Sequence, residues 1–128
     1  MIGYVTLGTN NFDKAVEFYD KLFEVIGAGR TMEAENYVVW APDPSQPSVS
    51  VMKPYDGNAA TVGNGSMVAI AVDSQEKVDA MYKKALELGA SCEGTAGPRD
   101  ELPGFYAGYF RDLDGNKLNA FYYEMPTA

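Results

Sequence analysis

The sequence predicts an α+β fold of two βαβββ modules in one chain, with mixed sheets curled around a shared cleft. The main evidence is an internal repeat, because Val5-Thr6-Leu7 recurs as Val68-Ala69-Ile70 at a spacing of 63 residues. Each copy continues with an amphipathic helical pattern and three strand-like runs. The chain has 128 residues, of which 46% are hydrophobic, so it can bury one core of ordinary size. We therefore predict a single domain, 1–128, in which the two modules share a core.

The first module is expected over about residues 1–57. Alternating side chains predict a strand at 2–7. A helix follows, with Asn10 as the predicted cap, and Gly27 ends it. Three strands come next, and a proline-rich loop separates the last two. Their predicted ranges are 30–34, 37–41 and 48–53.

A linker of about residues 58–64, rich in Gly and Asn, leads to the second module at about 65–128. A strand is predicted at 66–72. Asp73, with Glu76 three residues later, resembles a capping box at the start of a helix that Gly89 ends. The remaining strands are predicted at 91–95, 105–111 and 117–122, with a tight Asp114-Gly115 hairpin between the last two.

Composition excludes several classes of function. The net charge of −8 argues against binding nucleic acid, which requires clustered Lys and Arg. No apolar run approaches the roughly 18 residues of a membrane helix, so no membrane association is expected. The single cysteine, Cys92, is predicted to be a small core residue, and it cannot form an internal disulfide, which favours the cytoplasm. The sequence has no histidine, which removes the usual Ser/His and Cys/His nucleophile pairs.

Three segments carry a family resemblance. Residues 104–117 read GFYAGYFRDLDGNK, the opening strand reads VTL, and residues 15–19 have the pattern A-x-x-F-Y. Together they resemble the vicinal oxygen chelate superfamily, which includes glyoxalase I, bleomycin resistance proteins and extradiol dioxygenases. The family's C-terminal hairpin usually reads R-D-P-D-G-N, so Leu113 stands in place of the proline. The likeness covers almost the whole chain and implies the same paired-module fold.

The resemblance also implies where a metal would bind. Metal-dependent members hold the ion with a residue on the first strand of each module, often histidine, and a carboxylate on the last. The first-strand positions fall on Tyr4 and Met67. The last-strand positions fall on Asn119 and, within one residue, on Ser50. None of these is a good ligand for metals that favour imidazole and carboxylate, so we predict no metal and no cofactor, and we assign no catalytic residue.

Aromatic residues on the predicted strands indicate small-molecule binding in the cleft. Those that face it can stack on an aromatic or cationic ligand, and packing in the core is the ordinary alternative. Arg111 is expected either to hold an anionic group or to pair with Asp112 or Asp114. The candidate cleft positions are Tyr4, Trp40, Ser50, Met67, Phe105, Tyr109, Arg111 and Asn119.

Three functions are compatible with these residues. The one we predict is metal-independent binding of a small molecule in the cleft, as the resemblance to bleomycin resistance proteins implies. The second is a glyoxalase-type lyase or a dioxygenase with an unrecognised metal set. The third is a dimeric interaction module without a site. The resemblance also implies a homodimer, since pairing would cover the exposed sheet face of so short a chain.

Overall fold

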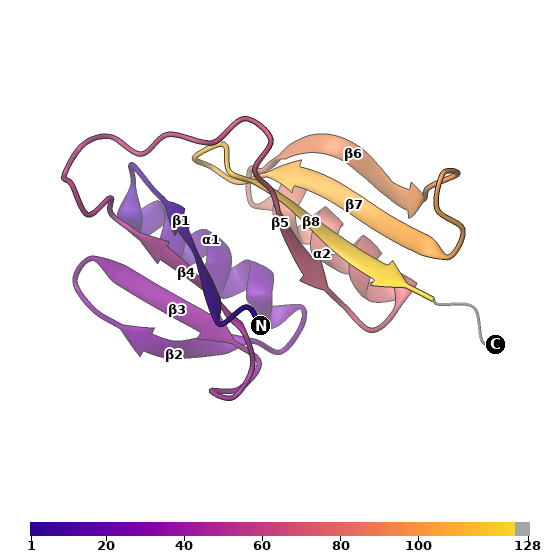
Figure 1. Cartoon of the computed structure of the whole chain (residues 1–128), viewed down its shortest axis with the longest axis horizontal. Helices are drawn as coiled ribbons and strands as arrows, with labels where there is room; N and C mark the ends of the chain where they lie inside the picture. Colours follow the sequence, from indigo (N-terminus) through magenta and orange to yellow (C-terminus); the bar gives the residue numbers. More distant parts are fainter. Residues whose placement is uncertain (125–128) are drawn as a thin grey trace.

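The structure, a computed structural model, describes residues 1–124 and contains two four-stranded mixed sheets, each with one helix (Figure 1). The strand orders are β1-β4-β3-β2 and β5-β8-β7-β6, so both modules have the same connections. In each sheet the first strand pairs in parallel with the last, and the other pairs are antiparallel. The predicted fold class is confirmed. The first module contains β1 (Tyr4–Gly8), α1 (Phe12–Glu24), β2 (Gly29–Glu33), β3 (Tyr37–Ala41) and β4 (Ser48–Met52), and the second contains β5 (Val68–Ala71), α2 (Gln75–Glu87), β6 (Ser91–Pro98), β7 (Phe105–Arg111) and β8 (Lys117–Tyr123).

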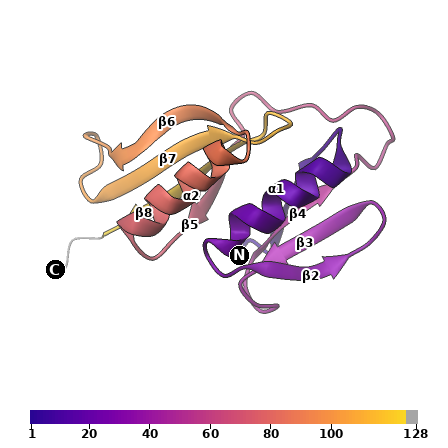
Figure 2. The ribbon, with the colours of Figure 1, turned by 180° about the vertical axis from the view of Figure 1, so that it is seen from behind.

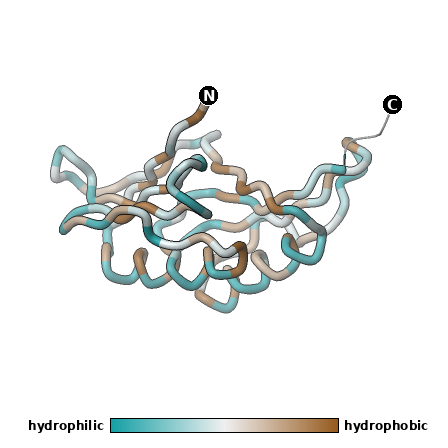
Figure 3. The backbone as a smooth tube through the Cα atoms, turned by 90° about the horizontal axis from the view of Figure 1, so that it is seen from below, coloured by the Kyte–Doolittle hydropathy of each residue, from teal (hydrophilic) through white to brown (hydrophobic). Residues whose placement is uncertain are grey.

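Both helices lie on the same side of the molecule. Figure 2 shows α1 and α2 in front of the sheets, and in Figure 3 they run along the lower side with the strands above them. Within residues 1–124 no helix covers the other side of either sheet, which we call the open face. Strand alternation directs Val49 and Val51 of β4, and Leu118 and Ala120 of β8, into the core beneath the helices. The alternate residues of these strands therefore point to the open face.

The cap of α1 is Asn11 rather than the predicted Asn10. The side chain of Asn11 accepts a hydrogen bond from the amide of Lys14 at 3.3 Å. Asn10 makes different contacts, because its side-chain amide pairs with both backbone groups of Ala60 in the linker, at 2.7 and 3.0 Å. Its backbone amide donates to the carboxylate of Asp114 at 2.8 Å. Asn10 thus joins the first module to the linker and to the last hairpin, which local sequence rules do not reveal.

The cap of α2 also differs from the prediction. The hydroxyl of Ser74 accepts from the amide of Lys77 at 3.2 Å, so Ser74 is the cap and Asp73 is not. The Asp73 carboxylate pairs instead with the Lys77 ammonium group at 3.1 Å. Either residue type can cap a helix, and the extended backbone at Ser74 decides between them.

Element boundaries otherwise shift by a few residues. Strands β1 and β5 each begin two residues later than predicted, and β6 continues three residues further, to Pro98. Residues 125–128 of the predicted second module lie outside the described residues. Neither α1 nor α2 is long and apolar enough to cross a membrane, and the described chain offers no other helix.

An aromatic cluster fills the core of the first module. The ring centroids of Tyr19, Phe23 and Trp40 lie 5.3 to 5.9 Å from one another. The Trp40 indole N–H donates to the carboxylate of Asp20 at 2.8 Å, which satisfies the one polar atom of the ring. The Arg30 guanidinium donates to the same carboxylate at 2.6 and 2.9 Å. Asp20 therefore ties β2 and β3 to α1.

Asp20 makes part of the stability dependent on pH. Hydrogen bonds from Arg30, followed by one from Trp40, lower the pKa of the Asp20 carboxyl below its ordinary value of 3.8. The resulting stabilisation is complete above the unfolded pKa and disappears as the pH falls through the lower folded value. We expect Asp20→Asn to reduce the free energy of unfolding by no more than about 1 kcal/mol near neutral pH, since the pair is partly solvated. Urea unfolding between pH 6 and pH 2.5 should show this difference vanishing in acid, and a constant difference would contradict the assignment.

The turn between β7 and β8 binds the two modules together. The Tyr19 hydroxyl of α1 donates to the Asp112 carboxylate at 2.6 Å, and both side chains are buried. The same carboxylate also accepts two backbone amides of the turn 112–116 and the side-chain amide of Asn116. Asn116 donates in addition to the carbonyl of Gly8 at the end of β1, at 3.0 Å. Burial, together with the Asp112 carboxylate, raises the pKa of the Tyr19 phenol well above 10.0, so it remains a donor at any physiological pH.

The first module has a matching turn that makes no such contact. Asp43 lies seven residues before Ser50, as Asp112 lies seven residues before Asn119. Each aspartate accepts the backbone amide two residues later, at 2.8 Å for Asp43 and 2.9 Å for Asp112. Asp43 is nevertheless exposed, whereas Asp112 is buried. The junction of the modules is therefore fastened at one end by turn 112–116, which we call the turn lock, and not at the other.

Cys92 is exposed, so the prediction of a core cysteine is wrong. Its thiol accepts a hydrogen bond from the Tyr82 hydroxyl at 3.0 Å, and this bond lowers the pKa of the thiol. Tyr82 is the repeat equivalent of Tyr19, but in the described residues no hydrogen bond joins it to the turn that contains Asp43. The two equivalent tyrosines thus have different partners, which accounts for the single turn lock.

Candidate functional site

Strand register identifies the four positions that the family resemblance singles out. In the first sheet Thr6 lies opposite Ser50, and in the second Ala69 lies opposite Asn119. Thr6 and Ala69 are equivalent in the repeat, so Ser50 and Asn119 are equivalent as well. This removes the one-residue uncertainty about the position in β4. Tyr4 and Met67 are equivalent too, because Tyr4 lies two residues before Thr6 and Met67 lies two residues before Ala69.

All four of these side chains belong to the open face, because their strand neighbours point into the core. Val5 and Val68 pack against the core and flank Tyr4 and Met67, which are 69% and 43% exposed. Ser50 and Asn119 lie deeper, at 4% and 2% exposed. The two modules therefore contribute one accessible and one buried position each.

The residues at these positions do not fit a metal ion. A phenol, an aliphatic hydroxyl, a thioether and a carboxamide provide neither imidazole nor carboxylate, the ligands that borderline metals favour. No group of three or more Cys, Asp or Glu side chains suited to a metal occurs elsewhere in residues 1–124. No step of a metal-dependent mechanism can be built on this donor set.

The amide oxygen of Asn119 is a buried acceptor without a partner. It is the only buried side-chain nitrogen or oxygen in the described part of the chain that makes no hydrogen bond. Its cross-strand neighbours are Ala69 on β5, which has no donor group, and Tyr109 on β7, whose hydroxyl makes no hydrogen bond to this oxygen. An unpaired buried carbonyl costs about 1–3 kcal/mol. This oxygen is therefore an unused acceptor on the open-face side of β8.

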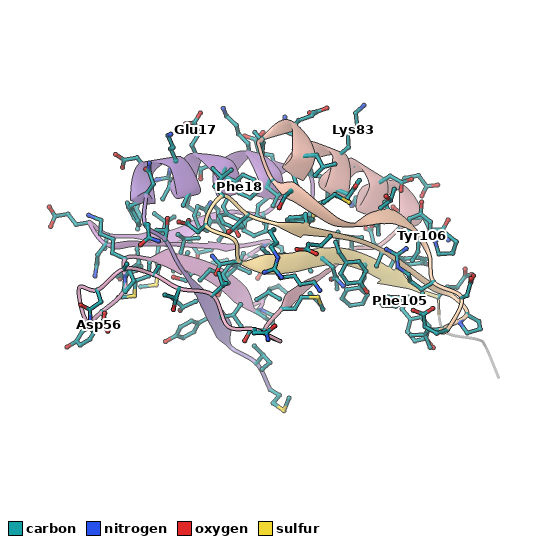
Figure 4. The ribbon with its side chains drawn as sticks, turned by 90° about the horizontal axis from the view of Figure 1, so that it is seen from above. Glu17, Phe18, Asp56, Lys83, Phe105 and Tyr106 are labelled. Carbon is teal, nitrogen blue, oxygen red and sulfur yellow. The ribbon has the colours of Figure 1, made fainter. Side chains whose placement is uncertain are left out.

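Aromatic rings line the open face of the second sheet. Phe105 stacks on Phe121 at 5.6 Å with an interplanar angle of 23°, and Tyr123 meets Phe105 edge-on at 6.1 Å. Figure 4 shows Phe105 on the side away from the helices and its neighbour Tyr106 toward them, where the Tyr106 hydroxyl donates to Asp79 of α2. The partly exposed Phe105 and Phe121 rings form an apolar surface that favours stacking on another ring.

Basic residues surround Tyr109 on the same face. The Arg99 guanidinium lies 5.2 Å and the Lys117 ammonium group 5.8 Å from the centroid of the Tyr109 ring. Arg111 pairs with Glu93 and donates to the carbonyl of Gly115 at 2.9 Å. The predicted pairing of Arg111 with Asp112 or Asp114 is therefore wrong. The Asp112 carboxylate accepts from the Tyr19 hydroxyl, and the Asp114 carboxylate accepts from the backbone amide of Asn10.

The comparisons with known proteins agree with this architecture. A family model described as the Glyoxalase/Bleomycin resistance protein/Dioxygenase superfamily matches residues 1–120. The chain belongs to this superfamily. A glyoxalase/bleomycin resistance protein from Albidiferax ferrireducens T118 is 31% identical, with a TM-score of 0.88 over 97% of this chain and 99% of that one. No curated protein matches the sequence.

Solved structures of lower identity share the fold. The fosfomycin resistance protein FosX from Mesorhizobium loti is 14% identical, with a TM-score of 0.69 over 98% of this chain and 92% of that one. A putative glyoxalase from Bacillus halodurans is 17% identical, with a TM-score of 0.76 and 95% coverage of both chains. At these identities the likeness concerns the fold alone.

Trp40 is the one predicted cleft residue that does not lie on the open face. Its indole packs beneath α1 and is 2% exposed. The alternation in β3 explains this, because Val38 and Trp40 both point into the core and their neighbours point away. The other seven predicted positions lie on the open face, and their role in binding stays a prediction.

A concavity occurs where the two modules meet. The free edges of β1 and β5 face each other there (Figure 1), and no ladder joins these strands in the described chain. A cavity of about 530 Å³ lies along this junction, and we call it the seam cavity. Met67 and Trp40 both line it, Trp40 from the helix side. Sequence reasoning missed the seam cavity because no local pattern shows how two modules are placed against each other.

Proposed function

We propose that this member of the superfamily binds an aromatic small molecule on its open face without a metal. The observation that carries the proposal is the set of neutral side chains at the four metal-ligand positions, together with the partly exposed ring pair of Phe105 and Phe121 on the same face. Arg99 and Lys117 already surround Tyr109, so an aromatic ligand suits this surface better than a cationic one. A ligand hydroxyl or N–H would supply the missing partner of Asn119.

One relative supports this class of function. The 31% identical relative is named a glyoxalase/bleomycin resistance protein, a name that refers to small molecules as substrate or ligand. The fold alone does not assign the activity of one member to another. The donor chemistry of Tyr4, Ser50, Met67 and Asn119 favours binding over metal-dependent catalysis.

The first test is metal content. Tag-free protein is exposed to nickel, zinc, manganese and iron(II), passed through gel filtration and submitted to elemental analysis. We expect far less than one metal ion per chain, because no imidazole exists and the four positions carry no carboxylate. Near-stoichiometric metal would instead favour a glyoxalase-type lyase or a dioxygenase.

The second test is ligand binding. A panel of neutral and anionic aromatic compounds is screened by calorimetry against wild-type protein, Phe105→Leu and the control Tyr106→Phe. Phe105→Leu should weaken binding, since it removes the stacked ring, while Tyr106→Phe alters only the helix side of the same strand. Absence of any ligand would favour a siteless interaction module, whereas equal binding by both variants would mean that the ligand does not stack on Phe105 and would contradict the proposed location.

The same proposal includes a homodimer in the cytoplasm. Tyr4 and Met67 are exposed on the open face, which also carries the partly exposed rings of Phe105 and Phe121, and so much apolar surface is usually covered by a partner. The single cysteine needs no oxidising compartment. Sedimentation equilibrium tests the dimer directly.

A further inference from the structure

The seam cavity lies at the unfastened end of the module junction. Its wall includes Pro42, Gln46 and Pro47 of the turn that matches the turn lock, and Ile70 and Ala71 at the end of β5. At the other end, turn 112–116 is held against α1 and β1 by the Tyr19 and Gly8 contacts. The cavity therefore exists because one of two equivalent turns docks on the opposite module and the other does not.

The lining of the seam cavity carries no charged side chain. Charged residues make up 22% of the chain, whose net charge is −8, so their absence from this wall is informative about its occupant. Phe23 of α1 and Ile26, just after that helix, line the cavity together with Trp40, Val5 and Val49, which point to the helix side of the first sheet. The only polar side chains are those of Gln46 and Ser48. Such a lining disfavours an ion, because burial away from water is costly for an unpaired charge.

The size and depth of the seam cavity favour a small molecule over a protein. Its volume of about 530 Å³ falls in the range of roughly 300–1,000 Å³ that is typical of ligand pockets. Phe23 and Trp40 in its wall are each 2% exposed, so a flat protein surface would not reach them. The indole N–H of Trp40 is already bonded to Asp20, which leaves its ring as an apolar contact. Gln46 and Ser48 provide at most a few hydrogen bonds at one side.

We propose that the seam cavity is a second binding site, for a small uncharged aromatic molecule, which shares only Met67 with the seven candidate positions on the open face. The ligand inserts between the two modules and contacts the Trp40 ring. It also fills the unfastened end of the junction, so that binding holds the modules together where turn 112–116 does not.

The chain contains a built-in reporter for this site, because Trp40 is its only tryptophan. The probe is N-phenyl-1-naphthylamine, which is uncharged, absorbs where tryptophan emits and becomes fluorescent in apolar surroundings. Titration into tag-free protein should quench Trp40 emission saturably, with one probe bound per chain. Absence of saturable quenching would overturn the proposal.

Two variants test the location. Ala71→Leu places bulk in the seam cavity, and Gln46→Glu places a charge at its wall without disturbing the core, since Gln46 is exposed. Each should weaken probe binding by at least about tenfold, corresponding to about 1.4 kcal/mol. The matched controls Ala80→Leu and Gln75→Glu lie on exposed positions of α2 outside the cavity and should leave binding within about twofold, as surface changes usually do. Equal affinity in all four variants would overturn the proposal.

Further controls separate the seam cavity from the open face and from a second copy of the chain. Phe105→Leu should leave probe quenching of Trp40 unchanged, because Phe105 does not line the seam cavity. If this variant abolishes quenching, the probe binds on the open face and the seam proposal fails, while the proposed function stands. If probe binding is lost as protein concentration rises and dimers form, a second copy occupies the seam cavity and the small-molecule proposal is overturned.

Discussion

Replacing Asp112 by alanine should lower the free energy of unfolding by about 3–5 kcal/mol. The carboxylate accepts four hydrogen bonds, and its loss leaves the buried Tyr19 hydroxyl and the amides of turn 112–116 without an acceptor. The matched control is Asp43→Ala, at the equivalent turn of the first module. Asp43 is exposed and bonds only within its own turn, so we expect a loss below about 1 kcal/mol. Urea unfolding of the two variants measures the difference.

A double-mutant cycle with Tyr19→Phe separates the contact between the modules from the turn itself. Tyr19→Phe should cost about 1.5–3 kcal/mol, as expected for a hydrogen bond to a charged acceptor, and should couple to Asp112→Ala. Its repeat equivalent, Tyr82→Phe, removes only a partly exposed bond to Cys92 and should cost much less. Equal losses for Tyr19→Phe and Tyr82→Phe would mean that the turn lock is not what holds the modules.

The fold was predictable because its evidence is local and repeated. The same strand and helix patterns occur twice, and β3 and β7 have the limits that alternation and turn residues predict. The caps were less predictable, because neighbouring residues of suitable type compete for one position, as Asp73 and Ser74 do. Only the backbone conformation at the helix start resolves that competition.

The turn lock could not be predicted from local sequence patterns. Asp43 and Asp112 both follow a strand and both accept the amide two residues later, so their local signals are alike. What distinguishes them is the partner from the opposite module, Tyr19 for Asp112, whereas the equivalent Tyr82 bonds Cys92. Cys92, which is the partner of Tyr82, is exposed for the same reason, because within residues 1–124 Tyr82 makes no contact like that of Tyr19 with Asp112. Such differences depend on contacts between residues far apart in the chain.

The strand positions of the candidate site residues could be predicted from the sequence, but the burial of their side chains could not. The repeat and the family resemblance place Tyr4, Ser50, Met67 and Asn119 at matching points, and strand register agrees with that equivalence. Their burial, from 69% exposed for Tyr4 to 2% for Asn119, depends on neighbours that only the packed sheets provide. The unpaired oxygen of Asn119 is likewise invisible in the sequence, because it is defined by the absence of a donor nearby.

That unpaired oxygen leads to a prediction in which stability and binding change in opposite directions. Asn119→Leu keeps the number and branching of side-chain atoms and removes the unsatisfied carbonyl, so it should raise the free energy of unfolding by about 1–2 kcal/mol. It should also abolish the binding of a ligand that donates a hydrogen bond to this position. Ser50→Ala, at the equivalent position, where no fully buried oxygen is left unpaired, should change stability by less than about 1 kcal/mol.

Urea unfolding with and without the aromatic ligand distinguishes the two effects. Wild-type protein should gain stability on adding the ligand, in proportion to the logarithm of its concentration above the dissociation constant, and Asn119→Leu should not. A residue retained at a cost to folding is best explained by what it binds, since proteins trade stability for function at their sites. If Asn119→Leu is instead less stable than wild type, the amide has a partner within the folded chain, and the open face loses its strongest indication of a ligand.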